Sequence, residues 1–266
     1  MNIELSKIYD ISDTRPLERI PEDGGFTGIF RTIGCIGDSL SSGEFEAKHE
    51  GNRTSYHDYY EYSWGQYIGR LVGSKIYNFS RGGTTAKEYC DEFAEHWRYW
   101  SSDMACQCYI IALGVNDLFG RKQPLGSVED IDFEDYNKNN KETFAGYYAM
   151  IIQRLKIIQP RARFFLMTMP KTDDEESNKV RAAHRELIYG MAEKFTKTYV
   201  LDFYKYAPVY GKEFNSLFML GHMNPAGYMV TAKMTAAYID YLIRHNMRDF
   251  MQVPFIGTDL YYEEEK

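Results

Sequence analysis

Two short segments of this 266-residue chain carry groups that could attack a carbonyl carbon and stabilise the negative charge that results. Gly37-Asp38-Ser39-Leu40 places a serine in a tight turn, where its hydroxyl can act as a nucleophile and its backbone N–H can bind an oxyanion. Arg81-Gly82-Gly83 is a glycine-rich turn whose backbone N–H groups can also point at an anion. Taken alone, each segment is also an ordinary turn, and Gly-Asp-Ser is an ordinary helix cap.

Two further segments could complete such a site. Gly114-Val115-Asn116-Asp117 contains an asparagine whose side-chain N–H₂ can donate to the same anion. Gly221-His222-Met223 contains a histidine that could act as a base, although a lone histidine is also a common cap or core residue. The other histidines are expected to be solvated, in a polar loop, on charged helices or near a helix end: His49, His57, His96, His184 and His245.

These segments can meet only if the fold brings them together, and the hydrophobic pattern predicts such a fold. Apolar runs at 31–37, 75–79, 107–113, 163–169 and 199–203 are typical of buried strands. Helices are predicted at 59–72, 85–100, 143–159, 179–196 and 225–246, and a long surface loop at 119–141. This alternation predicts a three-layer α/β/α sandwich with a parallel sheet. The carboxyl ends of parallel strands lie at the same edge of the sheet, and ligands bind there in such folds. We therefore expect all four candidate segments to lie at this edge.

Composition limits the class of protein. Hydrophobic residues make up 44% and charged residues 26% of the chain, which is typical of a globular protein. We expect a loop-rich lead-in at 1–30, a single domain at 31–250 and a tail at 251–266 with an acidic end. The net charge of −7 argues against nucleic acid as the main partner. No apolar run approaches the length of about 18 residues that a membrane-spanning helix needs.

Cysteine usage and the start of the chain favour a cytoplasmic location. The four cysteines form no C-x-x-C pair and no zinc-binding pattern, so we expect buried thiols and no metal site. The first twenty residues show no basic segment followed by an apolar core, so no signal peptide is visible. A chain from which a signal has been removed would look the same.

Together, the four segments resemble the SGNH (GDSL-type) hydrolases, whose name lists Ser, Gly, Asn and His. Ser39, Gly83 and Asn116 match the first three residues, and His222 with Asn224 and Gly227-Tyr228 is similar to the end of the last block. The resemblance spans residues 31–245. It implies a flavodoxin-like sheet of five parallel strands and a serine esterase or related acyl hydrolase that needs no metal or cofactor. The oxyanion hole would consist of Ser39, Gly83 and Asn116, with His222 as the base.

One position departs from this pattern. Members of the family usually carry Asp three residues before the histidine, and this chain has Met219 there. Three hypotheses follow. In the first, His222 forms a dyad with Ser39 and donates to a main-chain carbonyl. In the second, another acid substitutes, with Asp202 and Glu213 as candidates. In the third, the protein is catalytically impaired and only binds a carbohydrate or ester ligand.

The sequence restricts the identity of the substrate less than it restricts the type of reaction. Aromatic residues make up 16% of the chain, and those at 56–64 and 97–100 could stack on sugars, which suggests an acetylated carbohydrate. Packing is the alternative role of these rings, and the family resemblance also allows lipid acyl chains, thioesters and aryl esters. A flavin or nucleotide binder would share the fold class, but Gly37-Asp38-Ser39 would place a carboxylate where the phosphate binds. We expect Asp38, Asp117 and Asn78 to hold their loops, and Arg81 to face solvent.

Overall fold

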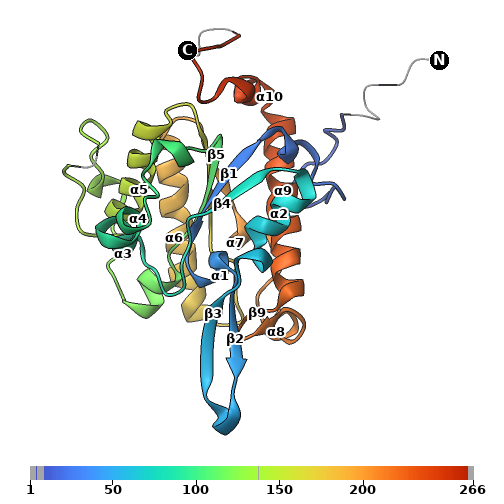
Figure 1. Ribbon diagram of the computed structural model, residues 1–266, viewed down its shortest axis with the longest axis vertical. Helices are drawn as coiled ribbons and strands as arrows, with labels where there is room; N and C mark the ends of the chain where they lie inside the picture. Colours follow the sequence, from blue (N-terminus) through green and yellow to red (C-terminus); the bar gives the residue numbers. More distant parts are fainter. Residues whose placement is uncertain (1–3, 5–8, 137, 263–266) are drawn as a thin grey trace.

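The computed structural model describes residues 4, 9–136 and 138–262, and its centre is a five-stranded parallel sheet (Figure 1). The strand order is β4 (Lys75–Asn78), β1 (Thr32–Gly37), β5 (Cys108–Ala112), β6 (Arg163–Met167) and β7 (Thr198–Leu201). In chain order this is 2-1-3-4-5, the flavodoxin-like arrangement, whose switch point lies between β1 and β5. The predicted α/β/α sandwich is confirmed, and the predicted strands coincide with the observed ones to within two residues at each end.

Each face of the sheet is covered by helices, which explains why the central strands β1, β5 and β6 are buried along nearly their whole length. On one face, Tyr109 and Ile111 of β5 pack into a core with α5 (Phe144–Ile158) and α6 (Glu175–Lys194). On the other, Cys108 and Ile110 pack into a core with α2 (Trp64–Val72) and α9 (Pro225–His245). Successive side chains of a strand point to opposite faces, so a single run of apolar residues supplies both cores.

Capping residues account for several helix boundaries. Asn224 accepts a hydrogen bond from Gly227 N and is followed by proline, so α9 begins where the sequence predicts. Asp174 caps α6 through the backbone of Glu176 and Ser177, and the helix therefore begins at Glu175, four residues before its predicted start. The single helix predicted at 85–100 is instead α3 (Ala86–Glu88), a π-helical turn (Tyr89–Phe93) and α4 (Ala94–His96).

An antiparallel hairpin that the sequence analysis missed follows the first strand. It consists of β2 (Glu44–Lys48) and β3 (Thr54–Asp58), and it extends away from the sheet beneath α1 (Ser39–Ser42) in Figure 1. The polar loop predicted around His57 is therefore wrong, and α2 begins at residue 64 rather than 59. The remaining short elements are α7 (Phe203–Tyr206), α8 (Lys212–Phe218), β8 (Met219–Leu220), β9 (His222–Met223) and α10 (Met247–Phe250).

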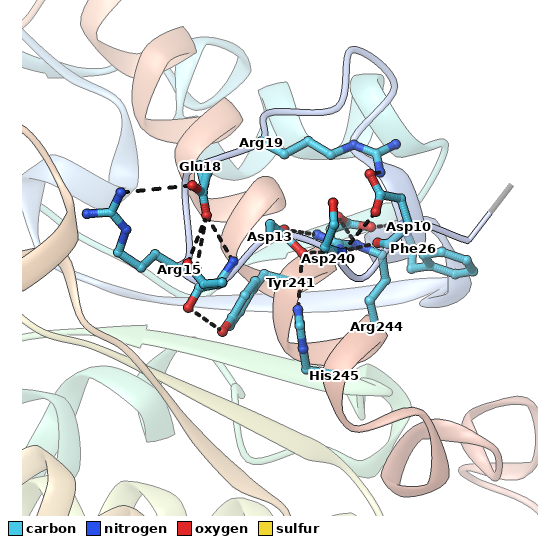
Figure 2. A network of polar contacts seen from close by, with 12 residues as sticks. Asp10, Asp13, Arg15, Glu18, Arg19, Phe26, Asp240, Tyr241, Arg244 and His245 are labelled. Atoms are coloured by element: carbon cyan, nitrogen blue, oxygen red, sulfur yellow. Dashed lines mark hydrogen bonds and ion pairs between the residues drawn. The ribbon is translucent and has the colours of Figure 1, made fainter. Parts of the chain in front are cut away.

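The described part of the N-terminal lead-in is held against α9 by a polar network (Figure 2). Arg244 is only 2% exposed and bonds to Asp13 and to Asp240, and Thr27 Oγ1 donates to the carbonyl of Ala236. Glu263–Lys266, the predicted acidic end, lie outside the described residues. Within the part of the chain that is described, no helix has both the length and the apolarity to cross a membrane.

Candidate active site

Ser39 is the first residue of α1, directly after the carboxyl end of β1. Asp38 caps this short helix by accepting a hydrogen bond from Leu40 N at 3.0 Å. Ser39 is 9% exposed, and its carbonyl accepts a hydrogen bond from the hydroxyl of Tyr228 at 3.3 Å. Burial raises the pKa of Asp38 to about 6, while the Leu40 N–H and the charge of His222 act in the opposite direction. As predicted, Asp38 holds its own turn.

Gly83 and Asn116 follow the two strands that flank β1. Gly83 has φ of 74°, a conformation that favours glycine, and a Cβ built on it would meet nothing within 4 Å, so the space beside it is open. Asn116 Nδ2 donates to the carbonyl of Thr84 at 3.2 Å. A side-chain amide has two N–H donors, and this bond uses one of them. Arg81 N donates to the carbonyl of Gly37, which joins this turn to the end of β1.

Asp117 connects the segment that contains Asn116 to the segment that contains Gly83. It is fully buried, and its Oδ1 accepts a hydrogen bond from Ala86 N at 2.8 Å. Its other carboxyl oxygen has no partner within the described residues. Desolvation raises the pKa of Asp117 to about 7 against the effect of the Ala86 N–H. As predicted, Asp117 holds its loop, although burial disfavours the charged form of its carboxyl group.

The imidazole of His222 lies between two carboxylates. Its Nδ1 is 3.0 Å from Glu46 Oε1, and its Nε2 is 3.1 Å from Glu44 Oε1. The His222 side chain is 20% exposed, and β9 packs against both α1 and β2. In the described residues no hydrogen bond joins the ring to Ser39 Oγ, which is common before substrate binds. The two glutamates were not among the candidates from the sequence, and the structure places both against the imidazole.

The hairpin explains why both glutamates face the ring. Glu44 and Glu46 are two residues apart in β2, so their side chains leave the same face of the strand. Phe45 points to the opposite face, where it packs against the rings of Tyr59, Tyr62 and Tyr228 at 5.4–6.1 Å between centroids. A slip of one residue would exchange the two faces, so the aromatic cluster sets the register that presents the acids. Alternation in Glu-Phe-Glu-Ala before a Glu-Gly-Asn turn is the sequence signal that was available.

The structure brings neither candidate acid to the ring. Asp202 is fully buried, and its carboxylate is bonded to Arg185 Nε at 2.7 Å and to Tyr189 at 2.9 Å. Glu213 is an exposed residue of α8, and no contact joins it to His222 within the described residues. Met219 pairs with Met223 across the β8–β9 hairpin and packs against the core on the α9 side.

A polar cleft and an apolar cavity lie next to the site. A polar cleft of about 450 Å³ lies beside Gly83 and is lined by charged side chains and by Trp97, which is 54% exposed. An apolar cavity of about 270 Å³ is lined by Leu40, Phe203 and four methionines: Met167, Met169, Met219 and Met223. Trp64 also lines it but is 2% exposed and belongs to the core. Among the described residues, no cluster of His, Cys, Asp and Glu is arranged to hold a metal ion.

Comparison with known proteins places this site in a family context. A model of the GDSL-like lipase/acylhydrolase family matches residues 35–230, a span that contains Ser39, Gly83, Asn116 and His222. No curated protein sequence matches the chain significantly.

Among solved structures, the fold is similar to a family two carbohydrate esterase from Clostridium thermocellum in complex with cellohexaose. The identity is 17% and the TM-score 0.57, over 90% of this chain and 67% of that chain. A family 3 carbohydrate esterase from the same organism has 15% identity and a TM-score of 0.50, over 80% of this chain and 97% of that chain. A family 2 carbohydrate esterase with a carbohydrate binding domain, from Corynascus thermopiles (Myceliophthora fergusii), has 15% identity and a TM-score of 0.54, over 86% and 69%.

Proposed function

Because the chain belongs to the GDSL-like lipase/acylhydrolase family, we propose that it is a serine esterase with Ser39 as nucleophile and His222 as base. The observation that carries this proposal is the strand order β4-β1-β5. Three neighbouring strands end in the segments that contain Gly83, Ser39 and Asn116, and β9 brings His222 to the same edge. This arrangement supports the proposal, because a serine esterase needs a nucleophile, oxyanion donors and a base at one place.

The proposed reaction has two similar steps. His222 removes the proton from Ser39 Oγ as this oxygen bonds to the ester carbonyl carbon. The oxyanion accepts hydrogen bonds from the backbone N–H groups of Ser39 and Gly83 and from Asn116 Nδ2. His222 then gives the proton to the leaving alcohol as the ester C–O bond breaks. Water repeats the sequence on the acyl-enzyme and releases the acid, and no metal ion or cofactor takes part.

We propose an acetylated carbohydrate as the substrate. The polar cleft beside Gly83 supports this choice, because the exposed Trp97 can stack on a sugar ring and Arg81 and His96 can bond to hydroxyl groups. Structural similarity to carbohydrate esterases supports it as well. The apolar cavity next to α1 favours a second candidate, an ester with a longer acyl chain.

A cytoplasmic location remains part of the proposal. All four cysteines are buried free thiols, which suits a reducing compartment: Cys35, Cys90, Cys106 and Cys108. The net charge of −7 gives no electrostatic attraction to nucleic acid, which supports a small-molecule or carbohydrate partner instead.

The test is hydrolysis of p-nitrophenyl acetate, butyrate and octanoate by the wild type and by Ser39→Ala, with a fluorophosphonate label located by mass spectrometry. We expect turnover that is lost in the variant, and the label on Ser39. Acetate release from acetylated cello-oligosaccharides, together with a preference for the acetyl ester, would support the carbohydrate substrate. A preference for octanoate would favour the longer acyl chain instead. Folded wild type without turnover or label would contradict the esterase and favour a binding protein.

A further inference from the structure

We propose that Glu46, carried by the β2–β3 hairpin, is the positioning residue that orients His222, in place of the acid that Met219 replaces. This inference rests on the proposed function and assigns the group that completes its Ser39–His222 pair. It places the third member of the site on an element between the first and second motif segments, far along the chain from the histidine.

The contact between Glu46 and His222 is supported from several sides. Glu46 Oε1 is 3.0 Å from Nδ1, the ring nitrogen that faces away from the reacting serine in a Ser–His pair. Tyr56, which lies opposite Glu46 in the hairpin, packs edge-on against the imidazole with ring centroids 6.0 Å apart. A Cβ built on Gly221 would stand 2.0 Å from Glu46 Oε1, so the glycine before the histidine leaves the space that the carboxylate fills.

Glu44 contacts the other ring nitrogen and therefore cannot orient His222 through Nδ1. It lies at Nε2, the nitrogen that must accept the proton of Ser39, and its carboxylate rests against Gly82, where a Cβ would be 1.9 Å from Oε2. A neutral imidazole has one N–H. If that N–H is on Nδ1 and points at Glu46, then Nε2 has a lone pair and must face a proton of the Glu44 carboxyl or of Ser39.

The charges around the ring agree with this division of roles. Three acids interact with His222, namely Asp38 before α1 and Glu44 and Glu46 on β2, and Asp58 on β3 interacts in turn with Glu44. Burial, the largest influence, raises the pKa of Glu44, with Asp58 and Glu46 adding to it and His222 opposing it. Glu44 therefore takes up a proton more readily than an exposed glutamate does, which removes its negative charge from the side of the ring that must face Ser39. Glu46 lies at Nδ1, where its carboxylate can hold the Nδ1–H tautomer and stabilise the imidazolium without taking its proton.

Kinetics of four variants test the assignment: Glu46→Gln, Glu46→Asp, Glu44→Gln and, as a control on the exposed turn of the same hairpin, Glu50→Gln. Gln preserves the shape of Glu46 and removes its charge, whereas Asp preserves the charge on a shorter side chain. We expect Glu46→Gln to lower kcat by about 10⁴-fold with little change in KM, as when the acid of a catalytic triad is replaced. Glu46→Asp should retain more activity than Glu46→Gln.

The pH profile separates orientation from a structural role. Loss of Glu46 should move the limb of kcat/KM that reports the histidine, whereas simple destabilisation would lower the profile without moving it. Thermal unfolding of each variant shows that it is folded. Wild-type-like kcat and pH profile in Glu46→Gln would overturn the proposal. So would a large loss in Glu44→Gln alone, which would assign the orienting role to Glu44.

Nuclear magnetic resonance of the His222 imidazole distinguishes failure of this inference from failure of the proposed function. We expect the Nδ1–H tautomer in the wild type and a changed tautomer population in Glu46→Gln, but not in Glu50→Gln. A wild type with no turnover and no label on Ser39 would refute the esterase, and the tautomer would still test Glu46. An active wild type whose His222 tautomer is the same in Glu46→Gln would refute only the role of Glu46.

Discussion

Replacing Asp117 by asparagine should remove a loss of stability that the wild type undergoes as the pH rises from about 4 to about 7. Asp117 is fully buried between the segments that carry Gly83 and Asn116, with one carboxyl oxygen bonded to Ala86 N and the other unpartnered in the described structure. Asparagine preserves the acceptor for Ala86 N and cannot ionise. The substitution therefore removes the charge while leaving the connection between the two segments in place.

The magnitude follows from the pKa of this carboxyl group. Desolvation raises the pKa of Asp117 from 3.8 to about 7, so the folded state holds a proton that the unfolded state releases. Stability is then highest below pH 3.8 and falls as the pH rises toward 7. At about 1.4 kcal/mol for each pH unit, the total loss is about 4 kcal/mol, of which about 3 kcal/mol falls between pH 5 and pH 9.

Urea unfolding at pH 5 and pH 9 measures this effect in the wild type and in Asp117→Asn. We expect the variant to gain about 3 kcal/mol relative to the wild type between the two pH values. The same substitution at the exposed Asp103 is the control and should produce no such difference. Equal pH dependence of the wild type and Asp117→Asn would refute the reasoning, because it would mean that the buried carboxyl is already charged at little cost.

Three further predictions concern other parts of the molecule. Asn116→Ala should lower kcat by about 10²–10³-fold, since it removes an oxyanion donor, and near-normal ester turnover would contradict that role. The hydrogen bond from Arg244 lowers the pKa of Asp13 to about 2, so this ion pair stabilises the fold above pH 3.8 and loses its effect as the pH falls toward 2. Asp13→Asn should therefore cost about 2 kcal/mol at neutral pH and flatten the acid dependence of urea midpoints; an unchanged acid slope would contradict this. Tyr228→Phe removes hydroxyl bonds to the carbonyls of Ser39 and Glu44 and should destabilise the protein by about 1–3 kcal/mol and slow labelling of Ser39; wild-type stability and labelling would argue against this bridge.

The framework of the fold was accessible from the sequence because its signals are local. The run at 107–113 is apolar throughout, which is typical of a strand with helices on both faces, and β5 occupies its centre. Asn224-Pro225 similarly marks the start of α9, since a capping side chain and a proline act within one helical turn. Where these signals were weaker, boundaries moved, as at the start of α6.

The hairpin was not predicted because its strands are largely polar and none of their residues is fully buried. One face contacts the rest of the protein through Phe45 and the other through polar residues such as Glu44 and Glu46, and the turn between the strands contains no two-residue hairpin signature. The pattern over 44–58 therefore looked like a loop. With the hairpin missed, Glu44 and Glu46 were not candidates for the acid.

What the sequence by itself determined was the set of groups at the strand ends, because strand, turn and helix cap are encoded by neighbouring residues. Ser39, Gly83 and Asn116 each follow a strand that the pattern predicts, and the parallel order brings them to one edge. Only the tertiary structure decided which carboxylate meets His222. Glu46 and His222 are 176 residues apart, and their contact depends on the hairpin register and on the packing of β9 against β2. No local pattern carries that information, because it arises from the packing of whole elements against one another.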